Sequence, residues 1–456
     1  MSTLPVKSQL AWLAVAGAGI ILMFRPGDPA QVPAMALSLA AIGLWATGAI
    51  PEYLTALGFV TIAMIFAVAP GEIVFAGFQS PALWLILGGL VLGVAVRNTG
   101  LGARIARRMA HAFGTSYWGV ITGVSVVATL MGFFMPSSMG RVVLLMPIAL
   151  SLCDEFGFTP GRPGRIGVVL AAALGSHVAT FSILPANVPN MVLVGSAETL
   201  YHVHFTYGEY LALHFPVLGL AKLMLMIPVI VWLYRDKPEV LVHPEHTTPM
   251  SGREKALSGI LVTALLLWMT DSWHHISPAW VSMAAGVVLL APKIALVSPK
   301  EFNEQINFGS LFYVGGVLGL GALVSHSGLG SAFAGMVLQF LPLAPNEPIA
   351  NFAALAALPT LVSMIATVTA APAVLTPLAV DLAHATGLPL MTVLHSQVLG
   401  FSNPLLPYES PPLVVAMALS GEGIGPAQRL CLILGLITIL VLLPLDFLWW
   451  RLLGMI

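Results

Sequence analysis

Long apolar segments follow one another along almost the whole chain, separated by short polar or Pro/Gly-rich stretches. A helix needs about 20 apolar residues to cross the hydrocarbon core of a bilayer, so segments of this kind predict membrane-spanning helices. The pattern therefore predicts an all-α polytopic membrane protein. We expect eleven spans, which cover residues 9–24, 32–49, 53–70, 80–97, 165–200, 208–234, 256–272, 277–292, 309–326, 389–420 and 426–450.

Two further apolar segments, residues 118–152 and 350–386, are too long for one helix and carry small polar residues and prolines in their middles. We predict that each is a re-entrant hairpin, in which two half-helices meet near the centre of the membrane. The spans at 165–200 and 389–420 are also broken, by stretches rich in Pro, Asn and Ser. Irregular backbone at that depth must be satisfied by protein or by water in a cavity, so the four breaks should converge on one cavity.

The order of these features repeats after half of the chain. The sequence Gly-Leu-Gly at 100–102 recurs at 328–330, an offset of 228 residues in a chain of 456. The two breaks in the hairpins and the two broken spans recur at similar offsets. The predicted organisation is a first helix within residues 1–30, one copy over 31–234, a polar linker over 235–255 and a second copy over 256–456.

Basic residues indicate how the two copies are oriented. An amphipathic helix predicted over residues 98–114 carries Arg104, Arg107 and Arg108, whereas the matching stretch at 328–341 has no Lys or Arg. Because cytoplasmic loops are enriched in Lys and Arg, we place the amino terminus, this helix and the linker in the cytoplasm. The two copies then have inverted topologies. Inverted repeats with broken helices that meet at mid-membrane are typical of secondary transporters.

Composition agrees with this interpretation. The chain is 58% hydrophobic and only 8% charged, far below the roughly 25% charged residues of soluble domains, which excludes an ordinary soluble enzyme. Its formal net charge of -1 provides no basic field for nucleic acid. We therefore expect an integral protein of a bacterial inner (plasma) membrane, with the bilayer and a small molecule as partners.

No catalytic or metal-binding pattern is present in the sequence. It contains no HExxH, P-loop, nucleophile elbow or cysteine-zinc spacing, so we expect neither an enzyme nor a bound metal. The two cysteines, Cys153 and Cys431, lie in or beside apolar segments and do not indicate a disulfide framework.

The breaks predict an anion site. The amino termini of half-helices present free N–H groups and a partial positive charge, so two hairpin tips that face each other can bind an anionic substrate. Ser137 and Ser138 at the first tip and Thr367 and Thr369 at the second have hydroxyls that can donate to a carboxylate. The alternative is that these side chains only cap the broken helices. Their matching positions in the two copies favour substrate binding.

Arg141 is the only basic residue inside either hairpin. An unpaired arginine at mid-membrane costs at least ~2.5–3.5 kcal/mol, so it needs a partner. It could bind a substrate carboxylate or sulfate through two parallel hydrogen bonds, or form a permanent ion pair with Glu409 or Asp381. Those two carboxylates are also the candidates for coupling to a cation or proton. His177 and His395 could relay protons, although a lone intramembrane histidine is more often a packing residue.

At these positions the sequence resembles the divalent anion/sodium symporter family, which is solute carrier 13-like and belongs to the wider ion transporter superfamily. In that family each hairpin carries a Ser-Asn-Thr motif, followed a few residues later by Pro-Ile. Here residues 137–139 precede Pro147-Ile148 and residues 367–369 precede Pro377-Leu378. The resemblance covers nearly the whole chain in order and spacing.

The broken helices of the family carry a Ser/Thr-Pro-Pro-Asn-like turn, and two stretches of this chain match it. The match implies that Asn187, Pro189, Asn190, Ser410 and Pro411 bind substrate. The resemblance also implies a scaffold domain that forms a homodimer and a mobile transport domain of hairpins and broken helices. It further implies elevator-type alternating access and substrates such as succinate, malate, citrate or sulfate.

Two departures from the family pattern bear on coupling. The motif asparagines, which in the family help to hold sodium and substrate, are replaced here by Ser138 and Val368. Valine has no side-chain oxygen for a hard cation. The string Pro-Ser-Ser-Met-Gly-Arg is closer to the Pro-Ser-x-x-Ala-Arg of the citrate and oxoglutarate/malate exchanger branch. An arginine could replace a cation's charge, so exchange or proton coupling is favoured over sodium symport. No cofactor is expected beyond Na⁺ or H⁺ as a coupling ion.

Two other functions stay open at this point. A cation/proton antiporter or arsenite-type permease of the same superfamily would use Asp381 and Glu409 as its working groups and Arg141 as a structural residue. An intramembrane enzyme would need a catalytic pair on matched positions, and the sequence has none. The prediction is therefore a secondary active transporter of di- or tricarboxylates, working by symport or exchange.

Overall fold

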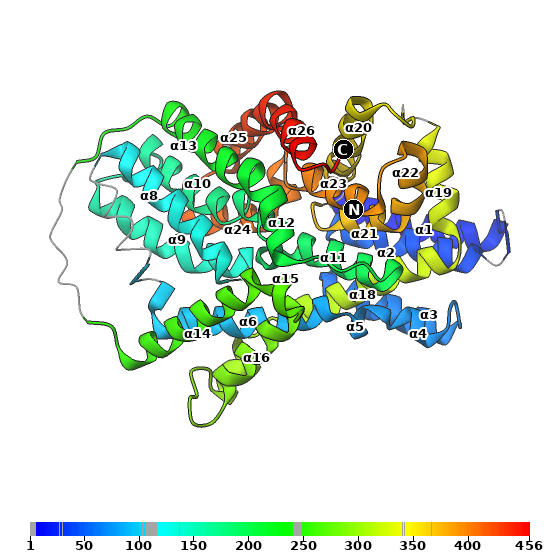
Figure 1. The fold of residues 1–456 in the computed structure, drawn as a ribbon, viewed down its shortest axis with the longest axis horizontal. Helices are drawn as coiled ribbons and strands as arrows, with labels where there is room; N and C mark the ends of the chain where they lie inside the picture. Colours follow the sequence, from blue (N-terminus) through cyan, green and yellow to red (C-terminus); the bar gives the residue numbers. More distant parts are fainter. Residues whose placement is uncertain are drawn as a thin grey trace, which may run out of the picture.

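The structure is a computed structural model, and all of its regular secondary structure is helical over the residues that it describes, namely 6–26, 28–29, 31–102, 104–105, 116–135, 137–239, 249–339, 341, 343–365 and 367–456. In Figure 1, helices α3, α6, α14, α16 and α18 form a layer along the lower side of the molecule, and the hairpins, broken helices and last spans lie above it.

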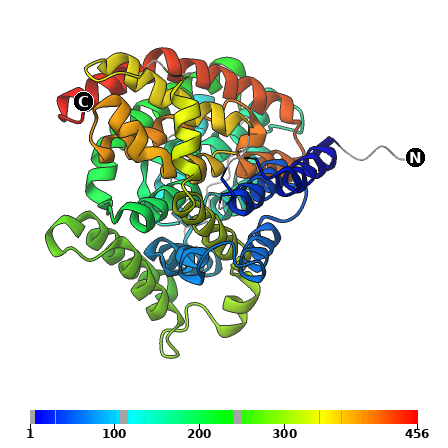
Figure 2. The same ribbon diagram turned by 90° about the vertical axis from the view of Figure 1, so that its right-hand side faces the viewer.

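The elements of the first half begin with the amino-terminal helix, which projects from one edge of the molecule (Figure 2). They are α1 (Val6–Phe24), α2 (Val32–Thr47), α3 (Glu52–Ile65), α4 (Gly71–Val74), α5 (Ala76–Gln79), α6 (Pro81–Thr99), α8 (Tyr117–Leu130), η1 (Met131–Phe133), α9 (Ser138–Glu155), α10 (Pro163–Gly175), η2 (Ala179–Ser182), η3 (Leu184–Ala186), α11 (Val188–Tyr201), α12 (Tyr207–His214), the π-helix η4 (Phe215–Ala221) and α13 (Lys222–Leu233).

The second half repeats this order. Its elements are α14 (Gly252–Met269), α15 (Asp271–His274), α16 (Pro278–Leu290), α17 (Pro299–Gln305), α18 (Phe308–His326), α19 (Leu329–Leu338), α20 (Pro348–Ile365), α21 (Ala370–Leu375), η5 (Thr376–Leu378), α22 (Ala379–Thr386), α23 (Leu390–Phe401), η6 (Pro407–Glu409), α24 (Pro411–Ser420), α25 (Ile424–Ile437), the π-helix η7 (Thr438–Leu442) and α26 (Leu443–Leu452).

Every predicted span overlaps one or more of these helices. Among the described residues, six helical segments are long and apolar enough to cross a membrane, and a seventh does so if the pair Ala370–Thr386 and Leu390–Phe401, bent by 117°, is one span. Six shorter apolar helices, of 10–17 residues, accompany them. The count of eleven spans, the re-entrant course of the hairpins and the orientation in the membrane stay predictions.

Glycines at equivalent positions allow the lower layer to pack closely. Gly88 of α6 faces the backbone of α16 so tightly that a Cβ at this position would lie 2.5 Å from the carbonyl of Ser282. A Cβ at Gly316 of α18, 228 residues later, would lie 2.5 Å from the Cβ of Ala56 in α3. The packed pair α6 and α16 therefore corresponds to the packed pair α18 and α3. Each pair contains one helix from each half of the chain.

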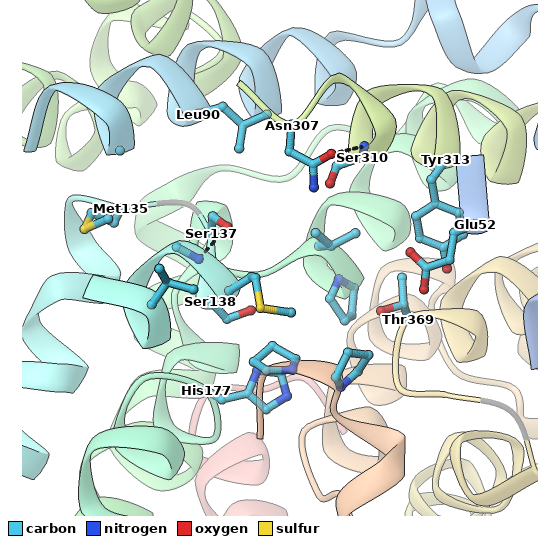
Figure 3. A pocket seen from close by; sticks show the side chains of 18 of the residues that line it. Glu52, Leu90, Met135, Ser137, Ser138, His177, Asn307, Ser310, Tyr313 and Thr369 are labelled. Atoms are coloured by element: carbon cyan, nitrogen blue, oxygen red, sulfur yellow. Dashed lines mark hydrogen bonds between the residues drawn. The ribbon is translucent and has the colours of Figure 1, made fainter. Parts of the chain in front are cut away.

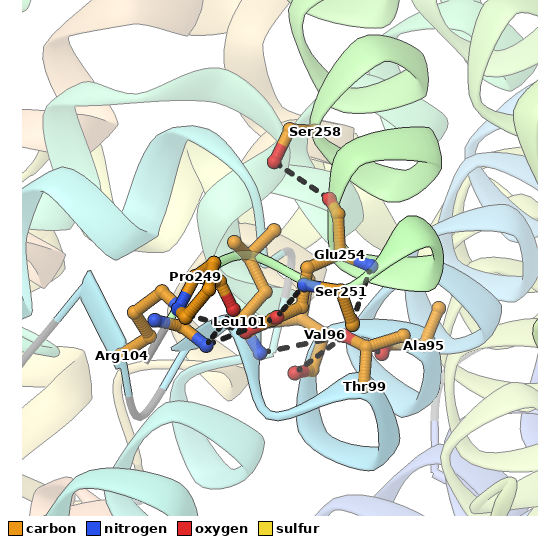
Figure 4. A network of polar contacts seen from close by, with 9 residues as sticks. All are labelled: Ala95, Val96, Thr99, Leu101, Arg104, Pro249, Ser251, Glu254 and Ser258. Atoms are coloured by element: carbon orange, nitrogen blue, oxygen red, sulfur yellow. Dashed lines mark hydrogen bonds and ion pairs between the residues drawn. The ribbon is translucent and has the colours of Figure 1, made fainter. Parts of the chain in front are cut away.

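The polar linker is shorter than the sequence predicts, because α14 begins before residue 256. Ser251 and Glu254 form a capping box at its start: the Ser251 hydroxyl accepts a hydrogen bond from the Glu254 N–H, and the Glu254 carboxylate accepts one from the Ser251 N–H. Arg104 also binds the Glu254 carboxylate, at 2.6 Å from Nε to Oε1 (Figure 4). Most of the amphipathic helix predicted over 98–114, including Arg107 and Arg108, lies outside the described residues.

Both cysteine thiols are buried and free. Cys153 lies near the end of α9 and Cys431 lies in α25.

Candidate functional site

Four breaks in the helices meet at one cavity of about 320 Å³ (Figure 3). The sequence-based expectation of a common cavity is therefore confirmed. Each break contributes residues at or beside the amino terminus of the helix that follows it. These residues are Ser137–Gly140 at α9, Val188 and Pro189 at α11, Val368 and Thr369 at α21, and Pro411 and Pro412 at α24.

The amino termini provide donors of two kinds. The first turn of a helix has N–H groups without acceptors inside the helix, and together they carry a partial positive charge. At α9 the first turn keeps its N–H groups, and the Ser137 hydroxyl accepts one of them, from Gly140, at 3.1 Å. At α24 the first two residues are prolines, which have no N–H to donate. The α9 end is therefore the better donor of these two.

The opposite wall comes from α6 and α18. Leu90, Gly93 and Val94 of α6 form an apolar side, and Arg97 lies on the exposed last turn of this helix. Asn307 and Ser310 at the start of α18 add polar groups: Asn307 caps the helix by accepting a hydrogen bond from the Ser310 N–H at 3.3 Å. Figure 3 shows Leu90, Asn307 and Ser310 across the cavity from Ser137, Ser138 and Thr369.

Arg97 is the one arginine or lysine in the cavity wall as described. Its guanidinium donates to the Gln305 amide oxygen, at 2.5 Å, and forms no ion pair with a carboxylate among the described residues. Glu52 also reaches the wall, on the side of Tyr313 and Thr369 (Figure 3). Besides His177, the cavity wall thus has one basic and one acidic side chain, both contributed by helices of the lower layer.

Arg141 does not line the cavity. Its side chain is fully buried beneath the α9 amino terminus and donates to the carbonyls of Met135, Ser176 and Ala186. It also donates to the Thr180 hydroxyl and to the Asn187 amide oxygen, both at 2.9 Å.

The predicted partners of Arg141 are not found. It forms no ion pair with Glu409 or Asp381, although all three residues lie in the described chain. Its positive charge is instead solvated by carbonyl and amide dipoles, which join the first hairpin to the break between α10 and α11.

Asn187 and Asn190 hold the first broken helix together. Asn187 is fully buried and donates to the Thr180 hydroxyl at 3.1 Å while it accepts from Arg141. Asn190, also fully buried, donates to the carbonyls of Phe181 and Ile183. Neither asparagine lines the cavity. In this structure both side chains support the backbone on which Val188 and Pro189 meet the cavity.

The second copy is built differently. The backbone N–H of Val368 donates to the Glu409 carbonyl at 3.2 Å, which joins the second hairpin to the second broken helix. Glu409 Oε1 accepts from the N–H groups of Leu405 and Leu406, whereas Oε2 has no partner. The buried Ser410 hydroxyl also has none.

Of the remaining candidate residues, Thr367 stabilises a helix start and Asp381 lies outside the cavity wall. Thr367 is half-buried, does not line the cavity and accepts weakly from the Ala370 N–H at 3.4 Å, so it caps α21. Asp381 lies on α22, away from the cavity wall. Of the predicted residues, those that line the cavity are Ser137, Ser138, Pro189, Thr369 and Pro411.

Much of the wall lies outside the predicted substrate-binding residues, including Arg97, Asn307 and His177, the last of which the sequence suggested only as a proton relay. Arg97 and Asn307 lie at helix ends whose approach to the breaks is a matter of tertiary packing. His177 follows α10, with both ring nitrogens unpartnered and the ring edge against Phe181. Its position at the start of a break was the signal available in the sequence.

Similarity to known proteins assigns the chain to a family. The family model described as the sodium:sulfate symporter transmembrane region matches residues 8–456. The chain belongs to the divalent anion/sodium symporter family. Membership in this transporter family also excludes an enzyme, and it makes the chain an integral protein of the plasma membrane.

Two relatives of the symporter family have informative names. An L-tartrate/succinate antiporter of Escherichia coli is 25% identical, with 98% of this chain and 95% of that protein covered. A sodium-dependent dicarboxylate transporter of Staphylococcus saprophyticus is 22% identical, with 68% and 66% covered.

The fold has solved counterparts. The Alcanivorax borkumensis YdaH transporter superposes with a TM-score of 0.55 over 87% of this chain and 89% of its own, at 15% identity. Neisseria gonorrhoeae MtrF, described as one of a class of antimetabolite efflux pumps, gives 0.56 over 93% and 95%, at 14% identity. At these identities the two structures support a transporter fold, while the family match supports small anions as the class of substrate.

Proposed function

We propose that this family member is a secondary active transporter of small di- or tricarboxylates, and that the substrate binds in the cavity between the breaks. The observation that carries the proposal is the convergence of four helix amino termini, two from each copy, on one cavity that also contains Arg97. Partial positive charge from opposite sides suits a ligand with a carboxylate at each end.

In the proposed complex, the α9 amino terminus binds one carboxylate and the α21 amino terminus binds the other. Ser137 and Ser138 add hydroxyl donors on the first side and Thr369 adds one on the second. Arg97, at the exposed end of the cavity, attracts the anion from solution, because its charge is not paired with a carboxylate. Arg141 is a positioning residue in this proposal: it holds the α9 tip and the α11 start in place.

Alternating access is proposed to follow the division of the molecule into two groups of helices. The lower layer of α3, α6, α16 and α18 serves as the scaffold, which also forms a homodimer, and the hairpins with the broken helices move against it as an elevator. If the amino terminus is cytoplasmic, the Arg97 end of α6 is cytoplasmic too, and the cavity faces inward in this conformation. The two copies are then inverted repeats.

Coupling is proposed to be by exchange or by protons rather than by sodium. Val368, which lines the cavity, provides no side-chain oxygen for a hard cation. The name of one relative includes sodium dependence and that of another includes antiport, so a direct comparison of gradients is required.

The proposal is tested with purified protein by thermal shift and then by uptake into proteoliposomes. Succinate, malate, citrate and sulfate are compared with the neutral dimethyl ester of succinate, each with sodium or potassium. A ligand at a hundred times its dissociation constant stabilises the folded state by about 2.7 kcal/mol, so a site for dicarboxylates should raise the melting temperature. Labelled succinate should then enter vesicles and be displaced by the same anions.

Two results would contradict the proposal. Stabilisation by cations alone, without any anion effect, would favour the antiporter alternative. Equal stabilisation by succinate and its dimethyl ester would show that the negative charges are not recognised.

A further inference from the structure

A second buried polar cluster lies behind the cavity, where the last spans of the two copies meet. Lys222 and Asp446 are both buried and lie beside two π-helices that pack against each other, yet the two side chains form no ion pair in the part of the chain that the structure describes. Lys222 Nζ donates to the Ser402 carbonyl at 2.8 Å. Both carboxylate oxygens of Asp446 have no hydrogen-bond partner, and its exposed fraction is 0%. An unpartnered carboxylate at full burial is costly, so it needs a ligand or a proton.

The backbone at this cluster is unusual in both copies. The π-helix η4 ends directly before Lys222, and the π-helix η7 ends four residues before Asp446. The two π-helices pack against each other. π-helical turns are rare and occur most often at functional sites. Two such turns at equivalent places, each next to one member of a buried charged pair, point to a function for the pair.

The groups that face this pair are all buried. Trp450, one turn after Asp446 in α26, has a buried indole N–H that is also unpartnered, so it is a hydrogen-bond donor that the Asp446 carboxylate can recruit. His214 Nε2 of α12 lies 3.0 Å from His395 Nδ1 of α23, and the His214 ring lies edge-on to Trp450 at 5.9 Å. The other ionisable groups are Cys431 of α25, which interacts with Lys222, and Tyr210 of α12, which contacts both histidine rings.

The cluster is connected to the substrate cavity at two points. His177, whose unpartnered ring lines the cavity, lies two residues before η2, and η2 packs against η4, the π-helix that ends directly before Lys222. Lys222 also binds the Ser402 carbonyl at the end of α23, where the second break starts, and the other end of that break reaches the cavity at Pro411. A change at Lys222 therefore acts both on the cavity wall and on one of the breaks that form it.

We propose that Lys222 and Asp446 form a proton-binding site that couples anion transport to proton movement, with His177 as the connection to the cavity. The inference rests on the proposed function, because it requires an anion in the cavity. The pair exchanges one proton with solution, so its total charge changes between zero and +1.

The coupling follows from electrostatics. A net positive charge in apolar surroundings is unfavourable unless a negative charge is near, and a bound dicarboxylate supplies one. Anion binding therefore favours uptake of a proton by the pair, and release of the anion favours its loss. By reciprocity, the protonated pair binds the anion more tightly.

The test uses the full-length protein in proteoliposomes with labelled succinate and a pH-sensitive dye inside. With the outside one pH unit more acidic, each coupled proton permits about tenfold accumulation of succinate at equilibrium. The dye should report acidification only when succinate is present, and a protonophore should abolish the accumulation. A sodium gradient of the same size without a pH difference should give no accumulation.

Asp446→Asn keeps the shape of the side chain but cannot take up a proton. Each variant is normalised to its own rate of succinate/succinate exchange, which needs no net proton movement. We expect Asp446→Asn to lose gradient-driven accumulation, from about tenfold to none. Asp381→Asn is the control, because Asp381 lies on α22, outside the cavity wall and outside the group of residues around Lys222 and Asp446; it should accumulate succinate as the wild type does.

The failures are distinguishable. Wild-type protein that transports no succinate under any gradient overturns the proposed function, and the proton site with it. Wild-type protein that exchanges succinate without moving protons overturns the proton site alone, as does an Asp446→Asn variant with full gradient-driven accumulation. If Asp446→Asn does not insert, Asp446→Glu keeps the ionisable group and should shift the pH dependence of accumulation; an unchanged pH dependence would contradict the proposal.

Discussion

The two halves of the chain, which we interpret as two copies of one repeat, have the same order of helices and opposite charges at their breaks. In the first copy, the positively charged Arg141 joins the hairpin to the broken helix through five hydrogen bonds and donates a sixth within the hairpin, to Met135. In the second, no basic residue lies in the corresponding helix, and the acidic Glu409 orders its own turn by accepting from two backbone N–H groups.

The difference between the copies lies in how completely the charged side chain at the break is satisfied, since each break also contains an uncharged buried group without a partner, Asn190 Oδ1 in the first and the Ser410 hydroxyl in the second. All nitrogens of the Arg141 guanidinium have partners, so the first break is held rigidly. In the second break, Glu409 Oε2 and the Ser410 hydroxyl are buried without partners. Groups of that kind are free to form new bonds when the surroundings change. The comparison suggests that the first break supports the cavity and the second break responds to its contents.

The largest effect is expected from Arg141→Ala. The substitution removes the donor to the buried carbonyls of Met135 and Ala186, whereas the Ser176 carbonyl keeps the Thr180 hydroxyl as a donor. Each unsatisfied buried group costs about 1–3 kcal/mol. We expect a loss of more than about 3 kcal/mol in stability together with loss of transport. The melting temperature in detergent and succinate uptake measure the two effects.

Arg141→Lys is the matched variant, because it keeps the charge and some of the donors. It should recover part of the stability and less of the transport, since lysine cannot reproduce the planar fork. If Arg141→Ala melts like the wild type and only substrate affinity falls, Arg141 contacts the substrate directly and the supporting role is wrong.

An intermediate effect is expected at Glu409. Glu409→Ala orphans the N–H groups of Leu405 and Leu406 and should cost about 2 kcal/mol in stability. Glu409→Gln keeps an acceptor for both and should cost less than about 0.5 kcal/mol, yet it removes the buried negative charge. Asp381→Asn, on α22 outside the cavity wall, is the control. A change in succinate transport for Glu409→Gln but not for Asp381→Asn supports a second break that responds to the substrate. A change for Asp381→Asn but not for Glu409→Gln would assign that response to Asp381 instead.

The helices and breaks could be predicted from the sequence because their causes are local. Apolar length sets the spans, and clustered prolines and asparagines interrupt them. The meeting of the four breaks followed from the need to satisfy irregular backbone inside a membrane. The start of α14 could also have been predicted, because Ser251 and Glu254 have the spacing of a capping box. The predicted linker, which extended to residue 255, did not take this signal into account.

The partners of buried charges could not be predicted in the same way. Arg141 and Lys222 donate to backbone carbonyls, which every residue has and which leave no pattern in the sequence. The sequence predicted Glu409 and Asp381 as acidic partners of Arg141, and neither forms an ion pair with it. The π-helices have no sequence signal either, and Arg97 reaches the cavity only through the packing of α6 against the breaks.

The smallest effect separates the two hairpin tips. Ser137→Ala removes a helix cap, worth about 1 kcal/mol, together with a substrate donor, whereas the Thr369 side chain makes no cap bond and lines the cavity. Both alanine variants should weaken succinate binding by about two- to tenfold, the value of one hydrogen bond. Only Ser137→Ala should also lower the melting temperature without substrate, and Ser137→Thr should restore it. Isothermal titration and thermal melting measure the two quantities separately. If Thr369→Ala lowers the substrate-free melting temperature as much as Ser137→Ala does, the second tip is as firmly built as the first, and the contrast between the copies does not extend to their tips.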